Sequence, residues 1–129
     1  MLLARIYLSV QALLLVGFGL AYLVRPQEMA NLSGMLLMEP AAITDVRGYY
    51  GGLQIGVGVF LVLALLRQAL LRPALTLLVL LYCAIALGRA AGLWLDGGLQ
   101  QTFNLYVMLF EIVSSGLAFA ILRGLDRQP

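Results

Sequence analysis

Four long apolar stretches alternate with short polar segments along the chain. A helix needs about 20 apolar residues to cross the roughly 30 Å hydrocarbon core of a bilayer. Arg25 and Pro26 close the first stretch, and Pro73 opens the third at a position that proline favours in helices. The pattern predicts four transmembrane helices, at Leu3–Val24, Thr44–Leu66, Pro73–Leu95 and Gln101–Leu122.

The first stretch lies where a secretory signal peptide would lie. A signal peptide ends in a small-x-small cleavage pattern, and no clear pattern of this kind precedes Arg25. We therefore expect residues 3–24 to be retained as a membrane helix.

Two short connections predict how the helices are arranged. Residues 67–72 join the second helix to the third, and residues 96–100 join the third to the fourth. Links this short make consecutive helices antiparallel neighbours. The sequence therefore predicts an all-α membrane protein with a single domain, residues 1–129, folded as an up-down four-helix bundle.

The arginines predict how the bundle is oriented. In this topology five of them fall on one side of the membrane, whereas the opposite loops offer mainly Arg25. Because positively charged loops remain in the cytoplasm, we expect both termini to be cytoplasmic and the protein to lie in a bacterial inner membrane as a multi-pass protein. The five arginines are Arg5, Arg67, Arg72, Arg123 and Arg127.

The longest connection, residues 25–43, is then on the outer side. Its apolar residues, which include Met29, Leu32 and Met38, argue against a freely solvated loop. We expect a short helix that ends near Gly34, followed by a turn. The segment then serves either as a flexible lid or as a packed plug.

Composition supports the lipid environment. Hydrophobic residues make up 63% of the chain and charged residues 11%, whereas a soluble domain has about 45–50% and about 25%. A soluble core of this length cannot bury so much apolar surface. The net charge is +2, but the arginines are scattered and form no basic stripe, so we expect no nucleic-acid partner.

Two residue counts restrict the chemistry. The chain has no histidine, and its single cysteine is Cys83. This composition excludes an internal disulfide, a C-x-x-C redox pair and zinc or haem sites that depend on histidine. We therefore predict neither a cofactor nor a metal site.

Two charged residues interrupt the last two helices with opposite signs, Arg89 in the third and Glu111 in the fourth. A charge at the bilayer centre costs roughly 2.5–3.5 kcal/mol on insertion scales, so such residues turn inward and pair. At 1.5 Å per residue, Arg89 lies about 10 Å and Glu111 about 15 Å below the outer surface. An arginine side chain spans that difference, and the sequence thus favours an ion pair.

Further polar residues gather in the outer halves of the predicted helices. The inner halves contain few, so the pattern predicts a polar pocket that opens outward and not a continuous channel. We expect the pocket to hold a small amphipathic molecule or a lipid. Its candidate ligand-binding residues are Asp45, Arg47, Tyr49, Tyr50, Gln54, Arg89, Asp96, Asn104 and Glu111.

Glycines recur at every fourth position of the second helix, at Gly48, Gly52 and Gly56. A small-xxx-small face lets the backbones of two membrane helices approach closely. We therefore expect these three glycines to form a packing face.

Three motifs carry a resemblance to a known family. They are D-V-R-G-Y-Y-G-G (residues 45–52), G-R-A-A-G-L-W-L-D-G (residues 88–97) and E-I-V-S-S-G (residues 111–116). Together they make the chain similar to the family called domain of unknown function 4345, a group of small bacterial DoxX-like membrane proteins. The resemblance implies a four-helix inner-membrane fold and no particular reaction. The positions it marks are Asp45, Arg47, Tyr50, Gly51, Gly52, Arg89, Asp96, Gly97 and Glu111.

Three functions are open at this point. The leading hypothesis is a binding protein in which Arg89 meets an anionic or carbonyl group of the ligand. The second is a structural or accessory subunit that packs against itself, as a homo-oligomer, or against a larger membrane complex. The third is an intramembrane isomerase with Glu111 as acid and base, assisted by Tyr49, Tyr50 or Asp45. Whether the protein is an enzyme stays open.

Overall fold

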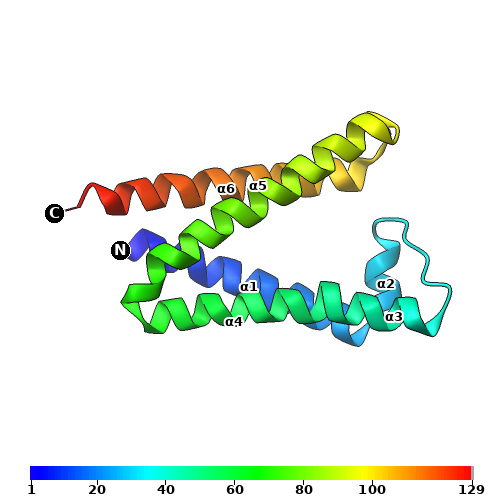
Figure 1. Cartoon of the computed structure of the whole chain (residues 1–129), viewed down its shortest axis with the longest axis horizontal. Coiled ribbons are helices and arrows are strands. Elements are labelled where there is room, and N and C mark those ends of the chain that lie inside the picture. Colours follow the sequence, from blue (N-terminus) through cyan, green and yellow to red (C-terminus); the bar gives the residue numbers. More distant parts are fainter. Residues whose placement is uncertain (129) are drawn as a thin grey trace. The chain divides into compact units, whose positions relative to one another are not determined.

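The computed structural model describes residues 1–128, apart from the side chain of Leu99. Every regular element within that range is a helix. Four helical segments are long and apolar enough to cross a membrane, which confirms the four predicted spans (Figure 1). They are Leu2–Val24, Pro40–Leu66, Gln68–Leu95 and Thr102–Asp126.

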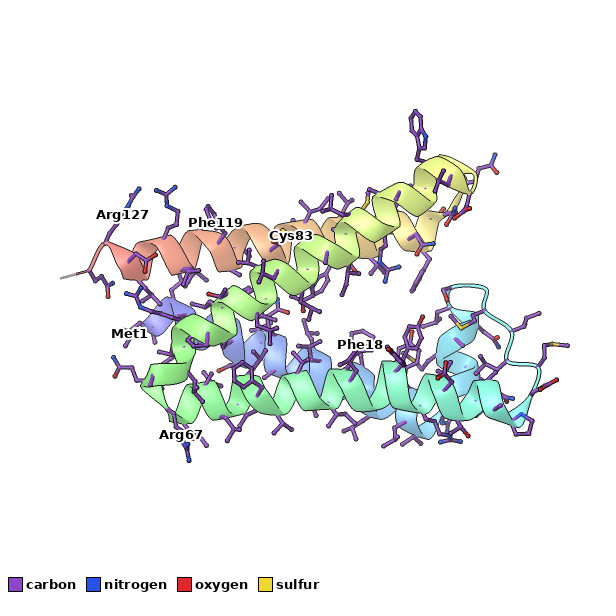
Figure 2. The ribbon with its side chains drawn as sticks, in the orientation of Figure 1. Met1, Phe18, Arg67, Cys83, Phe119 and Arg127 are labelled. Carbon is purple, nitrogen blue, oxygen red and sulfur yellow. The ribbon has the colours of Figure 1, made fainter. Side chains whose placement is uncertain are left out.

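Apolar side chains cover the outer surfaces of these helices (Figure 2). At most 33% of the most apolar part of any span is buried within the structure. Even a large side chain such as that of Phe119 is 50% exposed. Soluble proteins rarely expose apolar patches on this scale. The class of protein is therefore a multi-pass membrane protein, whose apolar surface is covered by lipid.

The chain divides into two compact units, which we describe separately. The N-terminal unit, residues 5–68, holds most of α1 (Leu2–Val24) together with α2 (Pro26–Asn31), α3 (Pro40–Val46), η1 (Arg47–Gly52) and α4 (Leu53–Leu66). The C-terminal unit, residues 69–128 with residues 1–4, holds α5 (Leu71–Leu95), η3 (Gly98–Gln100) and α6 (Thr102–Asp126). The short η2 (Gln68–Leu70) lies where the two units join along the chain.

The connection after α1 contains the short helix that the sequence predicts. Helix α1 ends before Arg25 and Pro26, and the proline occupies the first turn of α2, where its missing N–H is not needed. The turn that follows requires a glycine, because Gly34 has a φ of 79°. The prediction of a short helix and a turn near Gly34 is confirmed.

The second span contains a local irregularity that the sequence analysis did not predict. Residues Arg47–Gly52 form a π-helix, η1, between α3 and α4. A π-helical turn takes one more residue than an α-helical turn, and such turns are frequent at functional sites. The segment coincides with the R-G-Y-Y-G-G part of the first family motif.

Glycine brings α1 close to the second span, but not through the predicted glycines. A Cβ atom added to Gly19 would lie 2.8 Å from the carbonyl oxygen of Gly51, and one added to Gly58 would lie 3.1 Å from the backbone nitrogen of Val16. Cβ additions at Gly48 or Gly56 would meet nothing within 4 Å in the structure described.

Gly48, Gly52 and Gly56 therefore do not form the face that meets α1, and their role as a packing face stays a prediction. A four-residue repeat gives a spacing, but it does not determine which face of the helix meets its neighbour. The face in contact with α1 passes instead through Gly51 and Gly58, which are both buried.

In the C-terminal unit, α5 and α6 are antiparallel, as predicted (Figure 1). The turn between them depends on Gly97 and Gly98, whose φ angles of 118° and 73° strain any other residue. At the far end of the pair, Arg72 near the start of α5 forms an ion pair with Asp126 at the end of α6. Its Nη2 also donates to the carbonyl oxygen of Leu125 at 3.0 Å.

Candidate functional site

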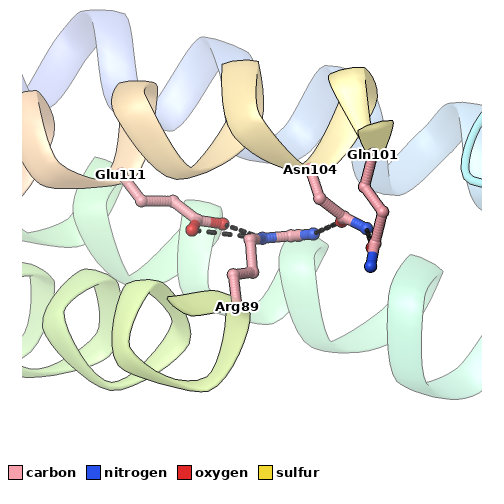
Figure 3. A network of polar contacts seen from close by, with 4 residues as sticks. All are labelled: Arg89, Gln101, Asn104 and Glu111. Carbon is pink, nitrogen blue, oxygen red and sulfur yellow. Dashed lines mark hydrogen bonds and ion pairs between the residues drawn. The ribbon is translucent and has the colours of Figure 1, made fainter. Parts of the chain in front are cut away.

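Arg89 on α5 and Glu111 on α6 form the ion pair that the sequence predicts (Figure 3). The Nε atom of Arg89 donates to both carboxylate oxygens of Glu111, at 2.9 and 3.1 Å. Its Nη1 atom donates to Oδ1 of Asn104 at 2.6 Å. Asn104 in turn donates from Nδ2 to Oε1 of Gln101 at 2.7 Å. We call these four residues the Arg89 cluster.

Burial divides the ion pair unequally. Glu111 is 4% exposed, whereas the side chain of Arg89 retains 29% of its exposure. A buried carboxylate is tolerable because the guanidinium beside it neutralises its charge and satisfies its oxygens. The same contact holds Arg89 in one orientation, with Nε turned to Glu111 and Nη1 turned to Asn104.

One guanidinium nitrogen of Arg89 makes no hydrogen bond within the described residues. Its Nη2 atom donates to no group in residues 1–128, and the side chain is partly exposed. A guanidinium has five N–H donors, so the cluster retains donors that are aimed but unused. Among the described residues no group of three Cys, Asp or Glu side chains is placed to hold a metal ion. The unused N–H groups of Arg89 are hydrogen-bond donors that an anion or a carbonyl oxygen could accept.

A second polar contact lies deeper along the same helix pair. The hydroxyl of Ser115 on α6 donates to the carbonyl oxygen of Val79 on α5 at 3.2 Å, and it lies 2.9 Å from Sγ of Cys83. Ser115 is 6% exposed. Ser115 follows Glu111 by four residues, about one helical turn, so its hydrogen bond is a second polar link between α5 and α6 next to the Arg89 cluster.

Sequence reasoning missed Gln101 as a member of the cluster. It was interpreted only as the first residue of the fourth span. The signal that would have found it is its spacing of three residues from Asn104, because side chains at i and i+3 are neighbours on a helix surface. In the structure, Gln101 precedes α6 and also donates to the carbonyl oxygen of Asp96 at 3.4 Å.

The side chain of the predicted site residue Asp96 does not contact the Arg89 cluster. It follows α5 at the turn, and its side chain is exposed. Its carboxylate makes no hydrogen bond or ion pair within the part of the chain that the structure describes, and only its backbone oxygen accepts a bond.

The remaining predicted site residues belong to the N-terminal unit. Arg47 donates from Nη1 to the carbonyl oxygen of Leu23 near the end of α1. Tyr50 stacks on Tyr22, with ring centroids 5.2 Å apart. Gln54 donates from Nε2 to the carbonyl oxygen of Tyr50 at 2.8 Å.

Two of the predicted residues have no such contact. Asp45 and Tyr49 are exposed, and neither side chain makes a hydrogen bond, ion pair or ring contact with another described residue. The nine predicted residues thus fall into two groups, one in each unit. Among them, side-chain contacts join Arg89 to both Glu111 and Asn104, and Gln54 to the backbone of Tyr50.

Comparison with known protein families identifies the family of this chain. Residues 3–122 match the family described as "Domain of unknown function (DUF4345)", so the chain belongs to that family. The resemblance seen in the sequence is confirmed. Neither a curated protein nor a solved structure matches the chain.

Proposed function

We propose that the protein is a single-domain, four-span bundle of a bacterial inner membrane, with up-down topology and both termini in the cytoplasm. The antiparallel pairing of α5 with α6 supports this topology. So does the Arg5 side chain, which donates from Nη1 to the carbonyl oxygen of Leu65 and thereby joins the start of α1 to the end of α4. The arginine distribution then favours cytoplasmic termini.

We propose further that the protein binds a small amphipathic molecule or a lipid through the Arg89 cluster. The observation that carries this proposal is the unused Nη2 of a partly exposed arginine inside a transmembrane span. A guanidinium recognises carboxylate, phosphate or carbonyl oxygens with several donors at once. An apolar ligand body would remain in contact with the surrounding lipid and helix surfaces.

Glu111 and Asn104 are positioning residues in this proposal. They fix two of the three nitrogens of the guanidinium before any ligand arrives. A donor that is already oriented loses less conformational entropy when a ligand binds. The buried carboxylate of Glu111 also offsets the cost of keeping a cation within the membrane.

A structural role is the second candidate, and a specific observation favours it. No buried side-chain nitrogen or oxygen in the described chain lacks a hydrogen-bond partner. The buried part of the Arg89 cluster is therefore complete without a ligand. Such a pair would fix the register of α5 against α6, in keeping with a structural or accessory subunit of a membrane complex.

Mass spectrometry of lipids and small molecules extracted from purified protein separates the two candidates. The comparison is between wild type and the double variant Arg89→Leu/Glu111→Leu, which removes both charges together. If the protein binds a ligand at Arg89, one lipid or small molecule should co-purify with the wild type and be absent from the folded double variant. A structural role predicts the same extract from both proteins.

A matched control is available on the same two helices. The double variant Arg72→Gln/Asp126→Asn breaks the other ion pair between α5 and α6, whose side chains are about half exposed at 55% and 54%. It should keep the co-purified species. Loss of the species from both double variants would point to general loosening of the helix pair and would count against binding at Arg89.

A further inference from the structure

A cleft of about 270 Å³ lies at the C-terminal end of α1, built entirely from the N-terminal unit. Its apolar wall comes from Val24, Pro26 and Ile43, and its polar wall includes Arg25, Glu28 and Arg47. Two guanidinium groups and one carboxylate thus line a single cleft. None of these residues belongs to the Arg89 cluster.

Arg47 reaches the cleft from the first residue of the π-helix η1. Its Nη1 donates to the carbonyl oxygen of Leu23, one of the last carbonyls of α1. A cation is favourable there because the C-terminal end of a helix carries partial negative charge. Its Nε and Nη2 atoms donate to no other group in residues 1–128, so part of its fork remains available.

Arg25 is held only loosely. Its Nη1 lies 3.2 Å from the carboxylate of Glu28, and both side chains are 69% exposed. Exposed ion pairs of this kind contribute little to stability and exchange partners readily. A stronger anion can therefore displace Glu28 from Arg25 without disturbing a buried contact.

The size of the cleft suits a headgroup. Pockets that enclose drug-sized ligands occupy roughly 300–1,000 Å³, and this cleft is slightly smaller at about 270 Å³. It lies just beyond the last residue of a membrane-spanning helix, Val24. Lipid headgroups occupy this level of a bilayer.

We propose that this cleft binds a phosphate group, with Arg25 and Arg47 as the ligands of its oxygens. Arginine is the residue whose planar fork best matches phosphate geometry. The phosphate comes either from a lipid headgroup or from free phosphate, and both sources present the same anion to the two guanidinium groups. Glu28 competes with that anion for Arg25. The proposal is independent of the function proposed for the Arg89 cluster, because the two sets of residues do not overlap.

Calorimetric titration of the full chain in a neutral detergent tests the proposal with three probes. Dihexanoyl phosphatidic acid, inorganic phosphate and dihexanoylglycerol are each added to wild type. If the cleft binds phosphate, dihexanoyl phosphatidic acid should bind, and dihexanoylglycerol, which lacks the phosphate, should not. Binding of inorganic phosphate with similar affinity assigns the site to free phosphate, and much weaker binding assigns it to a lipid headgroup. Absence of binding by both phosphate probes overturns the proposal.

Variants then locate the site. Arg25→Gln and Arg47→Gln should each weaken binding about tenfold, the change expected from losing one charge-assisted contact. Glu28→Gln should tighten binding by up to about fivefold, because it removes the competing anion. Arg67→Gln, an exposed arginine of the same unit outside the cleft, is the matched control and should bind as wild type does.

The Arg25 and Glu28 variants make the test independent of any folding defect in Arg47→Gln. Neither side chain is buried, and the only hydrogen bonds that either makes within the described chain are those that join the two. Equal binding by wild type, Arg25→Gln and Glu28→Gln overturns the proposal even if a phosphate probe binds. Equal losses in Arg25→Gln and Arg67→Gln also overturn it, because the effect would then be one of net charge.

Discussion

The two units bring their helices together by different means. In the C-terminal unit, α5 and α6 are linked by side-chain contacts along their length, from Arg72 and Asp126 through Ser115 to Arg89 and Glu111. In the N-terminal unit, α1 meets the second span through glycine, where the backbone at Gly19 lies directly against Gly51 and Ile55.

This difference shows two solutions to the same physical problem. Between helices surrounded by lipid there is no hydrophobic driving force, so association depends on close packing and on polar contacts. The C-terminal unit relies largely on polar contacts, and these leave one arginine with unused donors. The N-terminal unit relies on close approach at Gly19 and Gly58, where there is no room for a side chain, together with hydrogen bonds from Arg5 and Arg47 to backbone oxygens. Arg25 and Arg47 of this unit line the cleft at the end of α1.

The largest effect on stability is expected when only one partner of the buried ion pair between Arg89 and Glu111 is removed. Glu111→Leu leaves Arg89 without its counter-charge inside a span, and it should lower the free energy of unfolding by about 3–5 kcal/mol. Arg89→Leu/Glu111→Leu removes both charges and should cost clearly less. Unfolding in mixed micelles, followed by circular dichroism, measures both variants. A double variant no more stable than the single one would show that the pair is not coupled in this way.

The glycine contact predicts the next largest effect. A Cβ atom on Gly19 would lie 2.7 Å from Cγ1 of Ile55 and 2.9 Å from its backbone nitrogen. Gly19→Ala should therefore destabilise the protein by about 1–3 kcal/mol, the usual cost of overpacking. Gly17→Ala on the same helix meets nothing within 4 Å, and it should be neutral or stabilising by up to about 1 kcal/mol. Thermal unfolding of the pair provides the comparison, and equal effects would argue against close packing at Gly19.

The aromatic stack of the N-terminal unit predicts a smaller effect. Tyr50→Leu removes its ring contact with Tyr22, at 5.2 Å between centroids, and should cost about 0.5–1.5 kcal/mol. Tyr49→Leu is the matched control, because Tyr49 belongs to the same π-helix but is 70% exposed. Chemical unfolding of the two variants side by side measures the difference. A larger loss in Tyr49→Leu would contradict a role for the stack.

The smallest effect is expected at the exposed end of α5 and α6. Arg72→Gln removes the ion pair with Asp126, whose side chains are 55% and 54% exposed. Exposed pairs contribute about 0–1 kcal/mol, and salt screens them further. Unfolding at low and high salt should show a small difference from wild type that shrinks as salt rises. A loss as large as that of Glu111→Leu would mean that this end, and not the Arg89 cluster, holds the helix pair together.

The fold was predictable because a bilayer imposes a simple length rule on the sequence. The ends of the first and third spans were predicted at Val24 and Leu95, where the structure ends them. The second span starts earlier than predicted, at Pro40 and not at Thr44, because Pro40 opens α3 from the first turn of that helix, a position that proline favours. The π-helix at Arg47–Gly52 was not predictable, since no residue pattern distinguishes it from an α-helical turn.

The candidate site was predictable only in part. The pairing of Arg89 with Glu111 followed from their opposite charges, similar depths and neighbouring helices, and the structure confirms it. Asn104 contacts Arg89, but Gln101 was not predicted, and Asp96 meets the cluster only through its backbone oxygen. The polarity of a residue indicates that its side chain avoids lipid, but it does not specify which other polar side chain it contacts.

By itself, the sequence determined that this is a four-span membrane protein with one ion pair inside its last two helices. Hydropathy and charge decide such features residue by residue, through the cost of transfer into lipid. The tertiary structure alone decided which glycines touch a neighbouring helix, where the π-helix lies, and which arginines share a cleft. These depend on the rotation of each helix about its axis, which side-chain packing fixes and a linear pattern of polarity leaves free.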